Sequence, residues 1–489
     1  MIHKSYSSLL ILSLLWAVTA CTAHKQAHSP TVKVITTTGD RSKEFKTDTL
    51  ALFSADKTTN ANITLKPTEK FQTVYGFGAA ITGSTCYNLM QMSPADRKNF
   101  LIQTFSETEG FGQNFVRISI GCSDFSLSEY TLCDTKGIDN FALTQEETKY
   151  VIPILKEILA INPKVQIIGS PWTPPRWMKV NNLTDLQPYD HWTSGQLNPA
   201  LYQDYALYFA KWLQAMKDNG LNVNAITIQN EPLNRGNSAS MYMGWDEQLA
   251  FIKKALGKTL RDKGFAEVKI YLFDHNYNYD NMPSQQQYPL HIYKDTEASQ
   301  YITGAAYHNY GGNPDELNNI HNQYPNKELI FTESSIGTWN DGRNLERRLT
   351  EDMQELGIKT LNNHCKAVMV WNLMLDEHGA PNREGGCKTC FGAVDIQTSD
   401  YKTMQRNSHY YVISHLSAVI KQGATRIGVE KTTDDNVQCT AFQNPDGSLA
   451  CVLLNKKKEA THLTLSTGKQ YFSYEVPANS VVSFLIPKI

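Results

Sequence analysis

The feature that most constrains this chain is a series of eight short, β-branched apolar runs that alternate with longer amphipathic segments between residues 72 and 375. Such runs are typical of strands buried on both faces, and their alternation with helices favours a parallel sheet. Eight units predict a (β/α)8 TIM barrel, with a doubly wound sheet as the alternative. The runs are QTVYGFGAAIT (72–82), FVRISIGCSD (115–124), VQIIGSPWT (165–173), NAITIQNEP (224–232), VKIYLFDHN (268–276), ITGAAYHNYG (302–311), LIFTESS (329–335) and AVMVWNLML (367–375).

Helix signals separate these runs. Ser93 before a proline, and Asn198 before another, are typical of helix starts, while Thr144 and Glu147 have the spacing of a capping box. Gly220 stands where a helix-terminating glycine belongs. One predicted helical face carries Leu201, Tyr205, Tyr208, Trp212 and Met216.

After about residue 411 the pattern changes to alternating strands separated by turns, which is typical of a β-sandwich. Residues 32–65 contain similar runs, so we expect this N-terminal segment to complete the same sandwich. The predicted organisation is a signal peptide at 1–20, a tether at 21–31, sandwich strands at 32–70, the barrel at 71–410 and the C-terminal sandwich at 411–489.

The N-terminus has the anatomy of an export signal: Lys4, an apolar run from Leu9 to Val18, and small residues before Cys21. The run is too short to span a bilayer. VTAC (18–21) resembles the lipobox of bacterial lipoproteins, in which the cysteine is acylated; a plain cleaved signal is the alternative. We therefore expect an exported outer-membrane lipoprotein that touches the membrane only through Cys21.

Two pairs of cysteines stand out. Cys387 and Cys390 have the CxxC spacing, but no second ligand pair for zinc is evident nearby, so we expect a disulfide-closed loop. Cys439 and Cys451 flank the turn NPDG and are either a cross-strand disulfide or two buried thiols.

Composition limits the partners. Lysine and arginine number 46 against 48 acidic residues, for a formal charge of −2, which does not fit a nucleic-acid binder. No HExxH, Walker or GxSxG motif occurs, so we expect no metal or nucleotide cofactor. We expect a monomer that binds an uncharged ligand.

Polar and aromatic residues collect where the predicted barrel strands end, which is where a (β/α)8 barrel carries its active site. Any one of them could instead cap a turn, but seven enriched strand ends favour a site. They are Asp124, Trp172, Asn230-Glu231, Asp274-His275-Asn276, His308-Asn309-Tyr310, Glu333-Ser334 and Trp371-Asn372.

Two carboxylates, Glu231 and Glu333, end the fourth and seventh strands, on nearly opposite sides of the ring. Retaining glycoside hydrolysis needs two carboxyl groups about 5 Å apart, one a nucleophile and the other an acid. The acid must hold its proton near neutral pH, which requires a raised pKa. The pair therefore predicts a retaining glycosidase.

The motifs GFGAAIT, SPWTPP, ITIQNEP, IFTES and VWNL, in this order, resemble glycoside hydrolase family 30, which includes glucosylceramidases and β-1,6-glucanases. The resemblance implies Glu231 as acid/base and Glu333 as nucleophile. It further implies Arg117 and Tyr310 on the nucleophile, Asn230 at the sugar 2-hydroxyl, Asp124 and Trp172 on the far hydroxyls, Trp371 as stacking floor and His308 at the wall. Structural alternatives are an ion pair for Arg117, core for Trp371, a turn cap for Asp124 and a satisfied wall residue for His308.

Departures from the glucosylceramidase branch concern the leaving-group side. Asn309 and Arg383 stand where that branch carries aromatics, and the loop REGGCKTCFG (383–392) is polar. This favours β-1,6-glucan as substrate over glucosylceramide. The alternatives are a glucosylceramidase, another exo-β-glucosidase or β-xylosidase of the family, or a non-catalytic glycan-binding lipoprotein.

Overall fold

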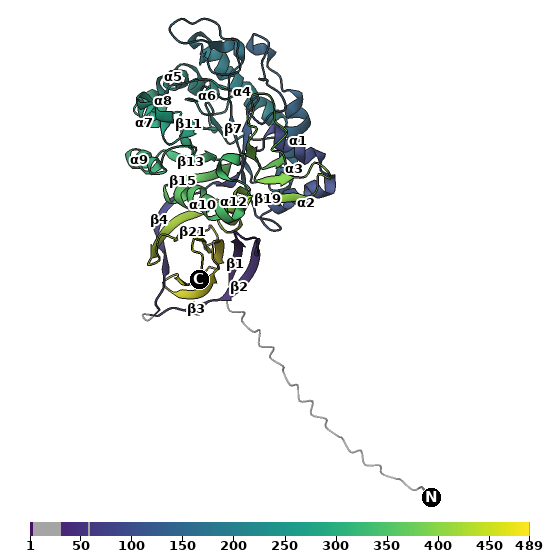
Figure 1. Ribbon diagram of the computed structural model, residues 1–489, viewed down its shortest axis with the longest axis vertical. Coiled ribbons are helices and arrows are strands. Elements are labelled where there is room, and N and C mark those ends of the chain that lie inside the picture. Colours follow the sequence, from purple (N-terminus) through teal and green to yellow (C-terminus); the bar gives the residue numbers. More distant parts are fainter. Residues whose placement is uncertain (3–30, 57–58, 489) are drawn as a thin grey trace.

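The computed structural model describes residues 1–2, 31–56 and 59–488, and it has a barrel stacked on an all-β unit (Figure 1). Nearly all of the predicted signal peptide, Cys21 and nearly all of the predicted tether lie outside these residues. Among the residues described, no helix has the length and apolarity needed to cross a bilayer.

Eight parallel strands form the barrel, one from each predicted run. In chain order they are β5 (Gly76–Ala79), β6 (Phe115–Ser119), β7 (Gln166–Ser170), β10 (Ala225–Thr227), β11 (Lys269–Asn276), β12 (Gly304–His308), β13 (Glu328–Glu333) and β15 (Cys365–Val370). Their spatial order follows the chain, β15 pairs with β5, and a parallel bridge from Ala80 to Arg117 closes the ring. The barrel prediction is confirmed, and the doubly wound alternative is wrong because the ring closes.

Helices surround the ring (Figure 1). They are α1 (Gly83–Gln91), α2 (Pro94–Phe105), α3 (Ile152–Ile161), α4 (Tyr202–Asp218), α5 (Trp245–Phe251), α6 (Gly257–Asp262), α7 (Tyr288–Tyr293), α8 (Thr296–Ser299), α9 (Asp315–Gln323), α10 (Leu345–Asp352), α11 (Thr360–Asn362) and α12 (Ser408–Val419). Ser93 caps α2 by accepting a hydrogen bond from the Asp96 backbone N–H, as its position before proline predicts. Gly220 follows α4 with a φ of 78°, which a glycine adopts without strain.

Helix α4 shows how sequence sets the packing of this ring. Its predicted apolar face, including Tyr205, Tyr208 and Trp212, is buried. Trp212 fits against β7 only because residue 169 is glycine: a Cβ there would lie 2.2 Å from the Trp212 ring. Strand β7 is therefore held in place by its close contact with helix α4.

The all-β unit is a ten-stranded sheet with the order β2-β1-β25-β22-β21-β20-β4-β23-β24-β3. Its strands are β1 (Thr31–Thr38), β2 (Lys46–Ala51), β3 (Phe53–Ser54), β4 (Ile63–Thr73), β20 (Thr425–Lys431), β21 (Val437–Gln443), β22 (Leu449–Asn455), β23 (Thr461–Ser466), β24 (Gln470–Val476) and β25 (Ser480–Ile486). Strand β1 pairs with β25 and β4 with β20, so N- and C-terminal segments build one sandwich, as predicted.

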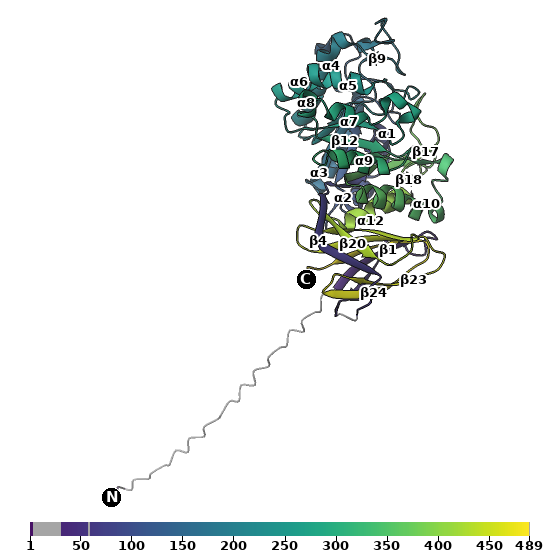
Figure 2. The ribbon, with the colours of Figure 1, turned by 90° about the vertical axis from the view of Figure 1, so that its left-hand side faces the viewer.

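Helix α12 joins the two units, and the predicted boundary between residues 410 and 411 falls inside it. Figure 2 shows it between the barrel and the sandwich strands. Its His415 contacts Ser483 Oγ and Thr37 Oγ1, both at 2.8 Å, and burial lowers the pKa of this imidazole to about 3. A neutral histidine thus ties the helix to β1 and β25, the paired N- and C-terminal strands of the sandwich.

Cys387 and Cys390 form a disulfide, which confirms the closed-loop prediction and excludes the zinc alternative. Cys439 and Cys451 are free, buried thiols on neighbouring strands. Cys439 is paired with Leu453 and Cys451 with Ala441, so the two cysteines are diagonal rather than directly opposite. Of the two alternatives, a cross-strand disulfide and two buried thiols, the structure shows the buried thiols.

Candidate active site

Glu333 is the last residue of β13, and Glu231 follows β10 by four residues. The backbone N–H of Glu231 donates to the Asp274 carbonyl at 3.0 Å, and its φ of 44° lies in the left-handed region. A non-glycine residue held there is strained, and such strain concentrates at functional sites. Both carboxylates therefore lie at the carboxyl end of the barrel.

One histidine lies between the two carboxylates. His308 Nδ1 is 3.2 Å from Glu231 Oε1 and 3.9 Å from Glu333 Oε1. The two oxygens cannot be farther apart than the sum of these distances. That limit admits the separation of about 5–5.5 Å found in retaining glycosidases and excludes most of the range of about 6.5–9.5 Å found in inverting enzymes.

Glu333 has two donors. Arg117 Nη1 lies 2.5 Å from Oε2, and the Tyr310 hydroxyl lies 2.9 Å from Oε1. Arg117 is fully buried, so its ion pair with Glu333 is not weakened by water. Both residues that the family resemblance assigns to the nucleophile thus contact Glu333 and fix its orientation.

Arg117 also binds Asp274, which the sequence pattern places at a strand end without indicating its role. Its Nη2 donates to Asn230 Oδ1 at 2.6 Å and to Asp274 Oδ2 at 2.7 Å. Burial would raise the pKa of Asp274, but the Arg117 charge and the hydrogen bond from His308 hold it well below its ordinary value. Asp274 is thus a buried anion that holds the Arg117 guanidinium in place. A carboxylate inside an otherwise apolar strand was the available signal.

Glu231 is surrounded by donors. Asn234 and Asn237 donate to its Oε2 at 2.8 and 3.1 Å, and His275 Nδ1 lies 3.7 Å from Oε1. Burial would raise the pKa of Glu231, but the hydrogen bonds and charges of His275 and His308 lower it. The prediction that the acid has a raised pKa is therefore wrong for Glu231 in the absence of substrate.

Both imidazoles of this cluster have raised pKa values instead. Burial opposes a charge on His308, but the carboxylates of Glu333, Asp274 and Glu231 raise its pKa to about 9. The pKa of His275 is raised as well, against burial, by Asp280 and Glu231. The sequence pattern places His275 at a strand end but indicates no role for it, because neighbouring strand residues normally point to opposite faces.

The two tryptophans form the far side of the site. Trp172 stacks on Trp371 at 5.2 Å between ring centroids, and the Arg117 guanidinium lies 4.9 Å from the Trp172 ring. Trp371 lines the active cavity, whereas Trp172 is not among the lining residues. Asp124 also lines it; burial and the charge of Glu333 raise the pKa of this carboxyl to about 7.

A cavity of about 290 Å³ opens in front of these groups. Its lining is mostly polar and consists of Asp124, Glu231, Asn234, Asn237, His275, Asn276, Asp280, Tyr310, Glu333, Ser335, Trp339, Trp371, Cys387 and Cys390. Trp339 is 53% exposed at this cavity. The polar lining and the exposed indole suit a sugar, which presents hydroxyls at its edge and an apolar face.

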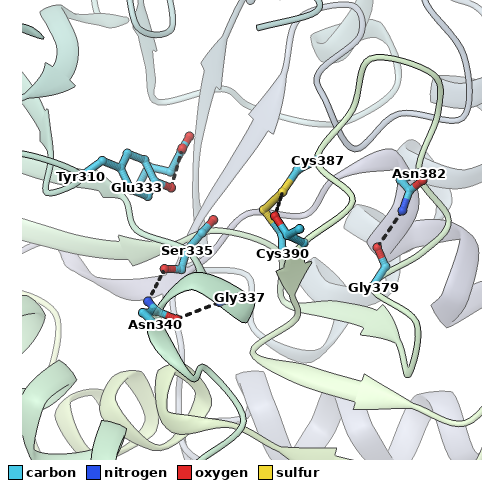
Figure 3. The surroundings of a disulfide bond; sticks show 10 residues. Tyr310, Glu333, Ser335, Gly337, Asn340, Gly379, Asn382, Cys387 and Cys390 are labelled. Atoms are coloured by element: carbon cyan, nitrogen blue, oxygen red, sulfur yellow. Dashed lines mark hydrogen bonds between the residues drawn. A yellow bond between two sulfur atoms is a disulfide. The ribbon is translucent and has the colours of Figure 1, made fainter.

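The disulfide-closed loop forms one wall of the cavity. Figure 3 shows the Cys387–Cys390 bond near Tyr310 and Glu333. Strand β17 (Cys390–Phe391) pairs with β14 (Ile336–Gly337), which begins three residues after Glu333. The wall is thus linked by backbone hydrogen bonds to the segment that carries this carboxylate.

Arg383 anchors the other end of this loop. It is 7% exposed, and it donates to the Ser123 carbonyl at 2.8 Å, to the Ser238 carbonyl at 2.5 Å and to Glu129 at 3.1 Å. Ser123 precedes Asp124, and Ser238 follows Asn237. One guanidinium therefore holds three loops that contribute to the cavity.

Comparisons with known proteins agree with this geometry. The model of the glycosyl hydrolase family 30 TIM-barrel domain matches residues 74–420, and that of the family 30 beta sandwich domain matches 423–484. A solved endo-beta1,6-glucanase is 59% identical, with a TM-score of 0.90 over 94% of this chain and 100% of that one.

Curated relatives include enzymes from both branches. An endo-1,6-beta-D-glucanase of Trichoderma harzianum is 32% identical over 86% of this chain and 85% of its own length. The lysosomal acid glucosylceramidase of Mus musculus is 28% identical over 86% of this chain and 83% of its own.

Proposed function

The chain belongs to glycosyl hydrolase family 30, and on that premise we propose that it is a retaining endo-β-1,6-glucanase. The observation that carries the chemistry is the pair Glu231 and Glu333, both within reach of one His308 nitrogen. The substrate is supported by the solved structure of 59% identity, which is that of an endo-beta1,6-glucanase. The polar wall built on Arg383 suits a sugar rather than a lipid on the leaving-group side.

In the proposed mechanism Glu333 attacks the anomeric carbon while Glu231 gives a proton to the leaving glycosidic oxygen. A glycosyl-enzyme forms, and the shortened glucan departs with that proton. Glu231 then removes a proton from water, which attacks the anomeric carbon and releases Glu333. Two inversions leave the product with the β configuration of the substrate.

The proton that Glu231 transfers comes from a neighbouring imidazole. His308 holds it 3.2 Å from Glu231 Oε1, since the surrounding carboxylates raise the pKa of His308 to about 9. Substrate binding removes water from the site and disfavours the separated ions, so the proton moves to Glu231. Because His308 supplies the proton, Glu231 can act as the acid without the raised pKa expected from the sequence.

The test of this mechanism is Glu333→Gln. The amide keeps the size of the side chain but is not a nucleophile, so turnover on β-1,6-glucan should fall by several orders of magnitude with unchanged folding by circular dichroism. Glu247→Gln is the matched control, because Glu247 is also buried but accepts its hydrogen bond from Gln196, away from the cavity. Near-normal turnover of Glu333→Gln would contradict the assignment of Glu333 as the nucleophile.

Product analysis tests the substrate. Incubation with β-1,6-glucan should give a ladder of oligosaccharides, while glucosylceramide should release little glucose. Glucose as the only product from the glucan would contradict endo action, and faster release from glucosylceramide would favour the other branch.

We also propose that the chain is exported and acylated at Cys21, as the export-like N-terminus and VTAC suggest. The enzyme would then act as a monomer, held at the outer membrane by its lipid. Cys21→Ser should abolish incorporation of labelled palmitate and release the protein from the membrane fraction. Unchanged membrane retention in that variant would contradict the anchor.

A further inference from the structure

Three side chains at the carboxyl end of the barrel present metal-binding atoms to one another. Each of Glu231, His275 and His308 is buried, and one ligand atom from each lies within 4.8 Å of the others. The Nδ1 atoms of His275 and His308 face the same oxygen, Glu231 Oε1, at 3.7 and 3.2 Å. Two imidazoles and one carboxylate are a ligand set that suits zinc.

Each imidazole is oriented from behind by a second carboxylate. His308 Nε2 lies 3.0 Å from Asp274 Oδ1, and His275 Nε2 contacts Asp280 Oδ2. Histidines that bind metals almost always donate their other ring N–H to such a partner, which fixes the ring and strengthens the ligand. His308 therefore has the hydrogen-bonded support that zinc ligands have elsewhere, and a carboxylate lies in the same place behind His275.

The cluster is reachable and favours positive charge. Glu231, His275 and Asp280 line the cavity, so an ion can enter from solvent and keep water as a further ligand. Glu333 adds another carboxylate, 3.9 Å from His308 Nδ1. Neutral imidazoles with a divalent cation would supply the positive charge that these carboxylates attract.

We propose that Glu231, His275 and His308 form an inhibitory Zn²⁺ site. The ion binds both Nδ1 atoms and a Glu231 oxygen, and hydrolysis stops because the proposed acid/base is coordinated. Only the inhibition rests on the proposed function; the binding rests on the three ligand atoms alone. Harder ions such as Mg²⁺ prefer all-oxygen ligands and should not bind here.

Titration calorimetry with Zn²⁺ on the full folded chain tests the binding without any substrate. We expect one ion per chain, a higher melting temperature, and at least tenfold weaker binding in His275→Gln. The matched control is His321→Gln: His321 stacks on His364 at 3.7 Å, outside the active cavity, and its loss should leave the affinity unchanged. No binding heat, or equal affinity in His275→Gln, would overturn the site.

Initial rates on β-1,6-glucan test the inhibition separately. Zn²⁺ should abolish hydrolysis at concentrations that saturate the calorimetric site, and a chelator should restore it. Zn²⁺ bound with full hydrolysis would refute inhibition through Glu231. If the protein bound Zn²⁺ but never hydrolysed the glucan, the proposed function would fail while the site stood.

Discussion

A rise in pH should remove a defined part of the stability of this protein through His308. The folded protein raises the pKa of this imidazole from its usual 6.5 to about 9, because carboxylates outweigh the effect of burial. A group with a raised folded pKa stabilises the fold fully below its unfolded pKa and loses that contribution as pH rises through the folded value. For His308 the loss runs from pH 6.5 to about 9 and amounts to about 3 kcal/mol, at about 1.4 kcal/mol per pKa unit.

Urea unfolding of the wild type and His308→Gln, at pH 6 and again at pH 10, measures this term. Glutamine does not titrate, so the difference in unfolding free energy between the two proteins should shrink by about 3 kcal/mol over this interval. Comparing the proteins with each other cancels the titration of the groups that do not interact with His308. Parallel curves, with a difference that stays constant with pH, would refute the electrostatic account of His308.

His409 provides the matched control. It is also buried, but burial lowers its pKa to about 4. Its contribution is present above pH 6.5 and is lost only as pH falls through about 4, so His409→Gln should show no loss on the alkaline side.

Activity adds a second readout, because kcat/KM of the wild type should fall as the pH passes about 9 and His308 loses the proton that Glu231 needs.

Substitutions at three places test other parts of the structure. Arg383→Met should cost roughly 3 kcal/mol in urea unfolding and raise KM, since it leaves buried carbonyls without a donor, and Arg383→Lys should restore little because lysine lacks the planar fork. Gly169→Ala should cost about 1–3 kcal/mol in the same assay, because the new methyl meets Trp212; equal stability would mean that the contact relaxes freely. Replacing Cys387 and Cys390 by serine should raise KM more than it lowers the melting temperature, because the bond closes a short loop yet lines the cavity; an unchanged KM would contradict its role as a wall.

The barrel was predictable because its strands are buried on both faces and end in polar residues. Runs such as 224–232 and 329–335 show both properties directly in the sequence. The strand then places its terminal carboxylate with little freedom, so Glu231 and Glu333 could be named. Their roles in catalysis stay predictions until variants are measured.

The histidine and aspartate of β11 could not be assigned in this way. Phe273 and Asp274 have φ values of 68° and 62°, and the pairing register of β11 with β12 shifts between Phe273 and His275. This irregularity lets both Asp274 and His275 reach the site, although consecutive strand residues should face opposite ways. A backbone irregularity of this kind leaves no simple pattern in the letters VKIYLFDHN.

The pairing of β1 with β25 has a consequence for biogenesis. Thr38 of β1 is paired with Ser480 of β25. Strand β25 is synthesised long after β1, so the pairing of β1 on this side is completed late. Until β25 has been synthesised, β1 has no partner on one side, and an unpaired strand edge invites association with other chains. We therefore expect this edge of β1 to be open to other chains until β25 has formed.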